Sequence, residues 1–392
     1  MTRVLHVAPG QVRRSGIADY AIAFRRALSG APDLAIDSIH QVPGISLPQA
    51  RDMHLSDARI LSRHVIASGA VTRYDILHLE VGTELYPEFF FAYELARRTS
   101  LPLVLTVHDA PYTVKNLQPF VDLARFTPLP LRALRTAVNL TIGRSYEQWM
   151  IRRASIALVL SHRASVALTA RLHPGCVEVV PHVVLASTAP AARPAWDGST
   201  PLRILFFGFL YPPKGVDHLI AAMAELALDP SIRSRVRLSV CGGTANADHR
   251  DGYADALRRT VADGNLGDII TFAGFIPAEE VEGVISEHHV VVLPYLEAKE
   301  LSVSGPLIQA MSQGLVPIVT PARAMSEIVQ DGVTGFVVPV ADSAAIAACL
   351  RQLLASPALL DRLSNRARRS MADTHGWDAV ATRMVEIYAR VR

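Results

Sequence analysis

The sequence predicts an α/β protein built from two doubly wound, Rossmann-like parallel sheets, one in each half of the chain. Short runs such as Val290–Leu293, which is continuously apolar, and Leu103–His108, which is mostly so, are expected to be strands buried on both faces. Helical patterns alternate with these runs. The alternation stops at residues 185–201, LASTAPAARPAWDGSTP, and then restarts. A length of 392 residues also favours two hydrophobic cores over one.

Residues 1–190 are expected to form the first domain, in which strands and helices alternate. Its expected strands are Val4–Ala8, Ala35–Ile39, Asp75–Glu80, Leu103–His108, Ile156–Leu160 and Val177–Val180. Its expected helices are Ile17–Ser29, Asp52–Ala67, Glu88–Arg98, Arg163–Leu172 and a long, mostly helical stretch from Val114 to Arg153. Residues 191–201 are the expected linker, because they are rich in Ala, Pro and Ser and lack periodicity.

Residues 202–375 are expected to form the second domain on the same plan. Its expected strands are Arg203–Phe207, Val236–Cys241, Ile269–Phe272, Val290–Leu293, Val316–Thr320 and Phe336–Val338. Its expected helices include Val216–Leu228, Ala254–Asp263, Ala278–Ser286, Pro306–Gln313 and Met325–Gln330. Three helical patterns finish the chain, and the last, within residues 376–392, is expected to return to the first domain.

The stretch from Val290 to Thr320 carries the clearest candidate site. Ser304, Gly305 and Pro306 form a helix-start signal: a capping hydroxyl, a glycine that exposes backbone, and a proline suited to the first turn. Such a start presents N–H groups and the positive end of the helix dipole at the carboxyl edge of a parallel sheet, where ligands bind. We therefore expect an anion site here, with a plain helix cap as the alternative.

Composition and spacing disfavour several other kinds of site. A net charge of +3 is too small to argue for nucleic acid. Three scattered cysteines favour a reduced, cytoplasmic setting. There is no DxD, HExxH or spaced His/Cys cluster, so no metal is expected, and no GxGxxG after the first strand, which disfavours a nicotinamide cofactor. No signal peptide and no apolar run of about 18 residues are seen, so no spanning helix is expected.

The second half resembles the C-terminal domain of retaining GT-B glycosyltransferases, specifically family 4. The motifs that carry the resemblance are, in order, FFGFLYPPKGVDHLIAAMAEL, VCGG, ITFAGFIPAEEVEGVI, VVVLPY through AMSQGLVPIVT, and EIVQDGVTGFVV. SGIADYA, LTVHD and VVPHVV extend a looser similarity into the first half. The resemblance implies a GT-B fold with the ligand in an interdomain cleft. It also implies a nucleoside-diphosphate sugar as donor and transfer with retention of anomeric configuration.

The resemblance further implies which residues bind the donor. Lys214 and the N–H groups at Ser304–Gly305 would stabilise the charge of the leaving diphosphate. The other donor-side candidates are Gly16, Gly208, Gly274, Phe275, Pro306 and Gln309. The alternatives are a solvated surface lysine for Lys214 and an ordinary loop-to-helix turn for Gly16.

The candidates on the acceptor side end strands or begin a helix of the first domain. The resemblance implies that His108 lies near the reacting sugar, with a capped strand-end histidine as the alternative. Asp19, Glu80 and Asp109 are candidate acceptor-side residues. The alternative for Glu80 is a structural partner for a nearby arginine.

The sequence departs from the family pattern in two places. The family commonly has two glutamates eight positions apart, but Leu301 and Gln309 stand at those positions. Glu300 is the candidate substitute for the first, with Glu297 as a second possibility, and Gln309 can still bond ribose hydroxyls as a neutral partner. The loop from Gly208 to Tyr211 also lacks the usual basic residue. Diphosphate binding would then depend on Lys214 and the helix dipole, or on Arg14.

Residues 125–153 hold six arginines, one glutamate and several apolar side chains. A basic amphipathic helix can lie on an anionic membrane surface. The alternatives are a helix packed on its own domain and a cap over the acceptor site.

The whole pattern predicts a metal-independent retaining glycosyltransferase whose acceptor is a glycan, a lipid-linked glycan or a natural product. The alternatives are a nucleotide-sugar epimerase or pseudo-sugar transferase of the same fold, and a non-catalytic nucleotide-sugar-binding protein. A dinucleotide-dependent oxidoreductase is disfavoured by the missing fingerprint.

Overall fold

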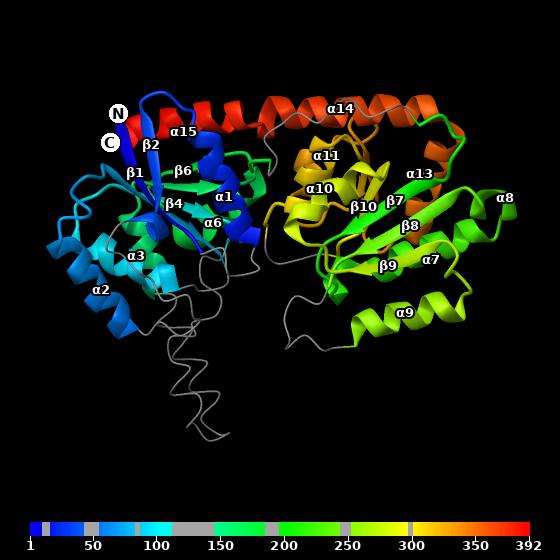
Figure 1. Ribbon diagram of the computed structural model, residues 1–392, viewed down its shortest axis with the longest axis horizontal. Helices are drawn as coiled ribbons and strands as arrows, with labels where there is room; N and C mark the ends of the chain where they lie inside the picture. Colours follow the sequence, from blue (N-terminus) through cyan, green and yellow to red (C-terminus); the bar gives the residue numbers. More distant parts are fainter. Residues whose placement is uncertain are drawn as a thin grey trace, which may run out of the picture. The chain divides into compact units, whose positions relative to one another are not determined.

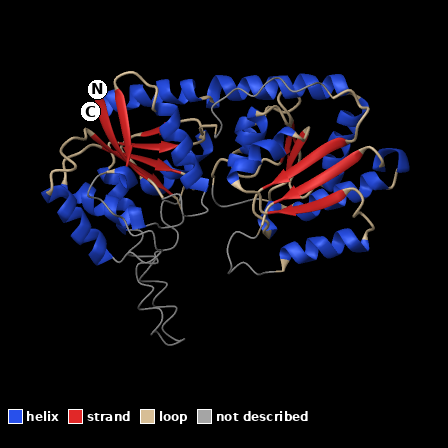
Figure 2. Ribbon diagram, in the orientation of Figure 1, coloured by secondary structure: helices blue, strands red, loops and turns tan. Residues whose placement is uncertain are grey.

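The chain divides into two compact units, which are described separately (Figure 1). The computed structural model describes residues 1–9, 16–42, 55–82, 87–111, 145–184, 196–243, 252–296 and 301–392. Unit 1 comprises Met1–Ser187, Glu300–Val303 and Gly376–Arg392, and unit 2 comprises Thr188–Lys299 and Ser304–His375. Each unit has one parallel six-stranded sheet flanked by helices (Figure 2). The predicted fold class is therefore confirmed.

Unit 1 has the strand order β2-β1-β3-β4-β5-β6. The strands are β1 (Thr2–Val7), β2 (Leu34–Ser38), β3 (Ile76–Val81), β4 (Leu103–Val107), β5 (Ile156–Val159) and β6 (Val177–Val179). The main described helices are α1 (Gly16–Leu28), α2 (Leu55–Ala67), α3 (Pro87–Arg98), α6 (His162–Leu172) and α15 (Trp377–Val391), with the short turn η1 (Ile39–Gln41) after β2. The strand order reverses between β1 and β3. Ligands of open α/β sheets bind at the carboxyl ends of strands beside such a reversal.

The final helix, α15, packs on unit 1 against α1. Val380, Met384 and Ile387 are fully buried on one face of α15 at helical spacing. The Trp377 indole donates a hydrogen bond to the Val184 carbonyl oxygen at 3.1 Å. These buried side chains fix the position of the last helix on unit 1 (Figure 1).

Unit 2 has the strand order β12-β11-β10-β7-β8-β9. The strands are β7 (Leu202–Phe207), β8 (Val236–Cys241), β9 (Ile270–Gly274), β10 (Val290–Leu293), β11 (Val316–Val319) and β12 (Phe336–Val337). The helical segments are η3 (Pro212–Lys214), α7 (Val216–Ala227), α8 (Pro230–Arg233), α9 (Tyr253–Asp263), α10 (Ala278–Ser286), α11 (Gly305–Ser312), α12 (Met325–Ile328), α13 (Ser343–Ala355) and α14 (Pro357–His375).

The chain of unit 2 winds in two directions from its first strand. It runs from β7 outward through β8 to β9, then crosses back to β10 and continues to β12. Right-handed crossovers therefore place α7 and α9 on one face of the sheet and α11 on the other. The contacts agree, because α7 packs with α9 and α13, while α11 packs with α14. The reversal in strand order lies between β7 and β10.

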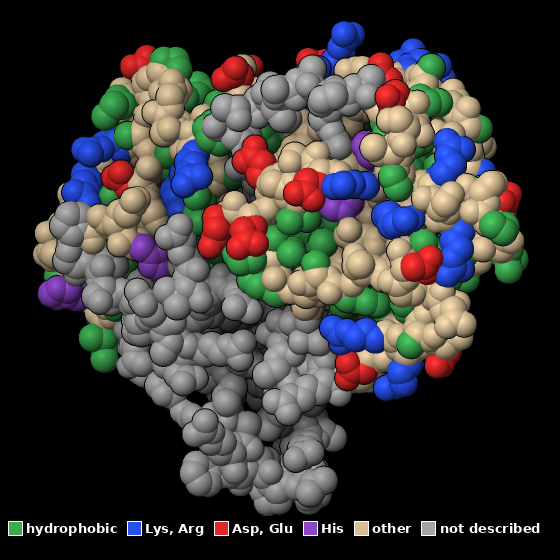
Figure 3. Space-filling view, turned by 45° about the vertical axis from the view of Figure 1, so that its right-hand side comes forward, with side chains coloured by type: hydrophobic (Ala, Val, Ile, Leu, Met, Phe, Trp, Pro, Cys, Tyr) green, Lys and Arg blue, Asp and Glu red, His purple; other side chains and the backbone are tan. Residues whose placement is uncertain are grey.

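Every expected strand is present, and each strand end lies within two residues of its expected position. Residues 114–144 of the long expected helical stretch and residues 191–195 of the expected linker lie outside the described residues. On the face shown in Figure 3, acidic and basic side chains are interspersed. Among the described residues, no single helix has the length and apolar composition to cross a membrane, although the bent pair Ser343–Ala355 and Pro357–Val391, at 108°, meets those two criteria together.

Gly242, after β8, provides a test of close packing at the carboxyl edge of the second sheet. A Cβ atom on Gly242 would collide with the Gly208 carbonyl oxygen. We expect Gly242→Ala to lower the free energy of unfolding by about 1–3 kcal/mol. Gly267→Ala is the matched control, because a Cβ there meets nothing within 4 Å, and it should stay within about 0.5 kcal/mol of wild type. Urea denaturation measures both unfolding free energies. Equal changes in the two variants would contradict the close approach of Gly242 to Gly208.

Candidate functional site

The first candidate site lies at the strand-order reversal of unit 2, where a tight turn carries Lys214. Two prolines open the turn η3, and Gly215 closes it with a φ of 64°. A Cβ on Gly215 would collide with the carbonyl oxygen of Pro294, which follows β10. The Leu296 N–H donates to the Pro213 carbonyl oxygen at 2.9 Å. These contacts fix Lys214 between the carboxyl ends of β7 and β10.

The Lys214 side chain is buried against aromatic rings. Its exposed fraction is 8%, and its Nζ lies 3.7 Å from the centroid of the Tyr295 ring and 5.4 Å from that of Tyr211. Burial and the nearby Arg323 guanidinium together lower the pKa of Lys214 to about 7, against the opposing effect of Tyr211. No carboxylate is among the groups that shift this pKa. Within the described residues, the ammonium group therefore has ring faces around it but no counter-ion.

The N-terminus of α11 lies beside the same tyrosine. Ser304 caps the helix, since its Oγ accepts the Leu307 N–H at 3.4 Å, and this Oγ lies 3.4 Å from the Tyr295 hydroxyl. Pro306 occupies the first turn and brings no N–H. The Gly305 N–H lies in the same turn, where no helical carbonyl can reach it. The positive end of the helix thus adds to the charge of Lys214.

Arg323 belongs to this site, although the sequence pattern alone assigns it no role. It follows β11, and its Nη2 donates to the Tyr211 hydroxyl at 3.3 Å. Its Cζ lies 5.7 Å from the centroid of the Tyr295 ring. A basic residue after the carboxyl end of β11, one strand away from the reversal, is the signal that could have identified it.

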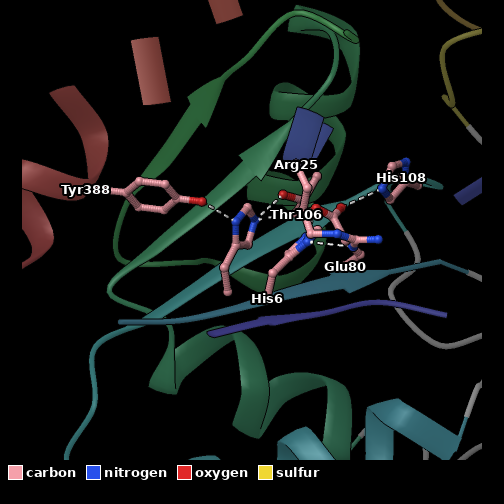
Figure 4. A network of polar contacts seen from close by, with 7 residues as sticks. His6, Arg25, Glu80, Thr106, His108 and Tyr388 are labelled. Carbon is pink, nitrogen blue, oxygen red and sulfur yellow. Dashed lines mark hydrogen bonds and ion pairs between the residues drawn. The ribbon is translucent and has the colours of Figure 1, made fainter. Parts of the chain in front are cut away.

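The second candidate site lies on one face of the unit 1 sheet and arises from period-two alternation. The register pairs His6 of β1 with His78 of β3, and Glu80 of β3 with Thr106 of β4. Side chains two positions apart share a face, so His78 and Glu80 lie together, and His108 continues from Thr106. Each of these strands therefore contributes polar groups to a single cluster (Figure 4).

Glu80 is the centre of this cluster. Its Oε1 bonds His6 Nε2 at 2.8 Å, and its Oε2 bonds His108 Nε2 at 2.7 Å. Burial alone would raise the pKa of Glu80, but the bonds from His108 and His6 outweigh it and hold the pKa well below the usual range. The carboxylate is therefore ionised and can only accept, so His6 and His108 each donate through Nε2.

Arg25 fixes the other side of His6. Its Nη1 lies 3.2 Å from His6 Nδ1, and a guanidinium can only donate. Neutral His6 therefore carries its proton on Nε2, in agreement with its bond to Glu80. Burial lowers the pKa of His6 more than Glu80 raises it. The lowered pKa favours the neutral form of the ring. A series of hydrogen bonds therefore runs from Arg25 through His6 and Glu80 to His108 (Figure 4).

His78 connects the cluster to the last helix. Its Nδ1 bonds the Tyr388 hydroxyl at 2.6 Å and its Nε2 bonds Thr106 Oγ1 at 2.7 Å. Burial lowers the pKa of His78 to about 3, so the ring is neutral. Donor atoms of His6, His78 and Glu80 lie within 4.8 Å of one another, a spacing that a metal ion could use. Because both nitrogens of His78 are hydrogen-bonded and Arg25 brings a positive charge to His6, the arrangement fits a hydrogen-bond network better than a metal centre.

The structure brings several of the sequence-predicted residues together. Gly208, Lys214, Ser304, Gly305 and Pro306 gather around Tyr295, and a Cβ on Gly208 would approach both the Tyr295 hydroxyl and Pro306. Glu80 and His108 form a buried pair in unit 1, and the hydrogen-bond partners of Glu80 are histidines rather than the arginine of the structural alternative.

The remaining predicted residues lie elsewhere or outside the description. Gln309 is buried in α11 with 8% of its surface exposed. Gly274 ends β9 and is followed by the exposed Phe275, two strands away from β7. Gly16 and Asp19 are exposed on the first turn of α1, and Asp109 directly follows His108. The candidates outside the described residues are Arg14, Glu297, Glu300 and the arginine-rich residues 125–144.

The Leu301 backbone N–H donates to the Ala110 carbonyl oxygen at 2.7 Å, which ties the segment before Ser304 to unit 1. Leu301 stands at a position where the resemblance expects a glutamate. Its side chain packs against the hydrophobic core of unit 1. An apolar residue therefore suits this position structurally.

Comparisons with known proteins agree with the geometry of unit 2. Residues 201–356 match the family model for Glycosyl transferases group 1. A D-inositol 3-phosphate glycosyltransferase of Streptomyces avermitilis is 31% identical over 193 residues, which cover 47% of this chain and 39% of that protein. An alpha-D-kanosaminyltransferase of Streptomyces kanamyceticus is 24% identical over 313 residues, covering 77% and 74%. The chain spans about two fifths of the length of the inositol-phosphate enzymes of S. avermitilis and S. griseus, at 39% and 38%.

Solved structures show the same fold along the whole chain. Sucrose-phosphate synthase from Thermosynechococcus elongatus has a TM-score of 0.73 at 18% identity and covers 100% of this chain and 99% of its own. HepE of Anabaena, solved with UDP, has a TM-score of 0.69 at 16% identity and covers 100% of both chains. With two parallel six-stranded sheets of this kind, the chain has the GT-B fold, and its residues 201–356 carry the match to the group 1 glycosyl transferases.

Replacing Lys214 tests whether its burial weakens the fold. The pKa of Lys214 falls from its ordinary 10.5 to about 7 on folding, so the unfolded state binds more protons between these values and stability rises with pH across them. The loss of unfolding free energy caused by burying the ammonium group is complete below pH 7 and shrinks towards pH 10.5. Lys214→Met should raise the free energy of unfolding at pH 6 by about 1–4 kcal/mol, and by less at pH 9. Chemical denaturation measures both, and a gain that does not vary with pH would contradict the assignment.

Replacing Glu80 tests the ordered cluster of unit 1. Glu80→Gln puts an amide donor opposite a histidine donor in a buried site, so we expect a loss of about 3–5 kcal/mol of unfolding free energy. Glu178→Gln is the matched control, because Glu178 pairs with Arg383 and Arg390 near the surface, and it should cost under about 1 kcal/mol. Nitrogen-15 NMR should find His6 and His108 protonated on Nε2 in the wild type. A His108 protonated on Nδ1 alone would exclude the assigned bond.

Proposed function

We propose that this protein is a glycosyltransferase that moves a sugar from a nucleoside-diphosphate sugar to an acceptor hydroxyl. One observation carries the proposal: a buried lysine without a carboxylate partner in the described residues lies beside a helix N-terminus at the carboxyl edge of a parallel sheet. A diphosphate supplies the negative charge that this site lacks. Lys214, Ser304 and Arg323 all fall within the residues that match the glycosyl transferases group 1 model.

The same charges explain how the site would assist bond cleavage. As the bond from the anomeric carbon to the diphosphate oxygen breaks, its electron pair passes to that oxygen and negative charge grows there. Lys214 and the Gly305 N–H are fixed before the reaction begins, so stabilising this charge requires no reorganisation. The acceptor oxygen then bonds to the anomeric carbon, and its proton passes to the departing diphosphate oxygen. We propose retention of configuration on the strength of the resemblance in motif order to retaining enzymes.

We further propose that the reaction needs no divalent cation. In this site the positive charge beside the diphosphate would come from Lys214 and the α11 dipole. His108, held by Glu80 at the end of β4, is the proposed group on the acceptor side.

The rival functions differ in what they release. A non-catalytic binding protein would bind the nucleotide sugar without consuming it, and an epimerase would form a free sugar or a changed donor without glycosylating an acceptor. The names of the relatives favour transfer, since they include glycosyl-, kanosaminyl- and mannosyltransferases.

Proton uptake on nucleotide binding provides a specific test. With a pKa of about 7, Lys214 is mostly neutral at pH 8, and a bound diphosphate should restore its charge. Titration calorimetry with UDP, GDP, ADP and dTDP, in buffers of different ionisation enthalpy, should therefore show uptake approaching one proton at pH 8 and little at pH 6. Lys214→Met should bind more weakly, without this linked uptake.

Binding of none of the four nucleotides would rule out the proposed donor class. For the nucleotide that binds, the matching sugar donors should release diphosphate in the presence of an acceptor, with EDTA present. Proton NMR of the product should show the anomeric configuration of the donor. Binding without any consumption of donor would favour the non-catalytic alternative.

A further inference from the structure

Arg323 occupies an unusual backbone conformation at the carboxyl edge of the unit 2 sheet. Its φ is 57°, in the left-handed region that favours glycine. Asn and Asp are the side chains best suited to this region, and Asn265 and Asp33 are two of the other described residues that adopt it. Arginine gains no such local advantage. A strained conformation that persists beside a candidate site is a reason to look for function there.

The chain around Arg323 is held firmly in place. The Thr320 hydroxyl, just after β11, bonds the Tyr295 carbonyl oxygen at 2.5 Å. Ala322 and Ala324 on either side of Arg323 are buried. The backbone therefore directs the guanidinium to the two tyrosines that also surround Lys214: it bonds the Tyr211 hydroxyl and lies near the Tyr295 ring.

Arg323 places a second positive charge close to that of Lys214. Its charge contributes to lowering the pKa of Lys214, so the two cations oppose each other. Neither strain nor repulsion favours an arginine here. A bound group with two or more negative oxygens would offset both, and the planar fork of a guanidinium matches phosphate oxygens in pairs.

We propose that Arg323 is the second cation of the diphosphate site, in place of the basic residue that the family pattern expects between Gly208 and Tyr211. The inference rests on the proposed function and extends it. Lys214 and Arg323 approach from different loops, after β7 and after β11, and share the Tyr295 ring. Two cations from different loops could each contact one phosphate of a diphosphate, so we expect them to favour a diphosphate over a monophosphate. The same role had been open to Arg14, and Arg323 fills it from within unit 2.

The experiment separates strain from binding by replacing Arg323 with glycine. Glycine adopts a φ of 57° freely, so Arg323→Gly should keep or raise the melting temperature of the full chain. Affinity for the nucleoside diphosphate that binds the wild type should fall about 10- to 100-fold, as expected for loss of a charge-assisted contact. Affinity for the corresponding monophosphate should change by under about threefold. Arg323→Lys should recover part of the diphosphate affinity.

Asn265→Gly is the matched control. Asn265 has a φ of 49° in the same unit, but it precedes β9 and so lies at the opposite edge of the sheet. It should leave both affinities unchanged. An unchanged diphosphate affinity in Arg323→Gly, or equal losses for diphosphate and monophosphate, would overturn this inference while the proposed function stands. If the wild type binds none of UDP, GDP, ADP and dTDP, the proposed function fails, and this inference fails with it.

Discussion

The buried ammonium of Lys214 is the interaction on which the arrangement of unit 2 depends. The turn that carries it, the close approach of Gly215 to Pro294 and the ring of Tyr295 all serve to hold a cation away from water. Ring faces compensate only part of the lost hydration, which is why the pKa of Lys214 falls to about 7. Among the described residues no carboxylate compensates the rest, so an anion bound beside Lys214 would stabilise its charged form.

The polar clusters at the strand-order reversals of the two units differ in their charge balance. Each sheet reverses its strand order once, between β1 and β3 in unit 1 and between β7 and β10 in unit 2, and each reversal carries a buried polar cluster. In unit 1 the charges are balanced within the protein, because Glu80 accepts from His6 and His108, and Arg25 stands behind His6. In unit 2 the described groups around Lys214 are cationic or neutral. A balanced cluster suits orientation of a side chain, whereas an unbalanced cluster suits binding of a charged ligand.

Local chemistry explains how much of this was predictable from sequence. Strand runs, the Ser304 cap and the Pro-Pro-Lys-Gly turn are local signals, and each appears where expected because neighbouring residues alone determine it. The network of Glu80 was not predictable as a network, since it depends on the register of three strands and on α15, more than 300 residues from His78. Arg323 was missed because its importance lies in a backbone angle and in two tyrosines distant in sequence.

The chain passes from unit 1 to unit 2 just before α11. The Leu301 N–H is bonded to Ala110, two residues beyond His108, and Leu301 belongs to unit 1, whereas Ser304 caps α11 and belongs to unit 2. Only three peptide bonds separate Leu301 from Ser304. A glutamate at position 301 would have to place a charge where Leu301 contributes to an apolar core. The departure from the family pattern at position 301 thus gives unit 1 an apolar contact close to Ala110, and the described cations near Tyr295 come from the loops after β7 and β11.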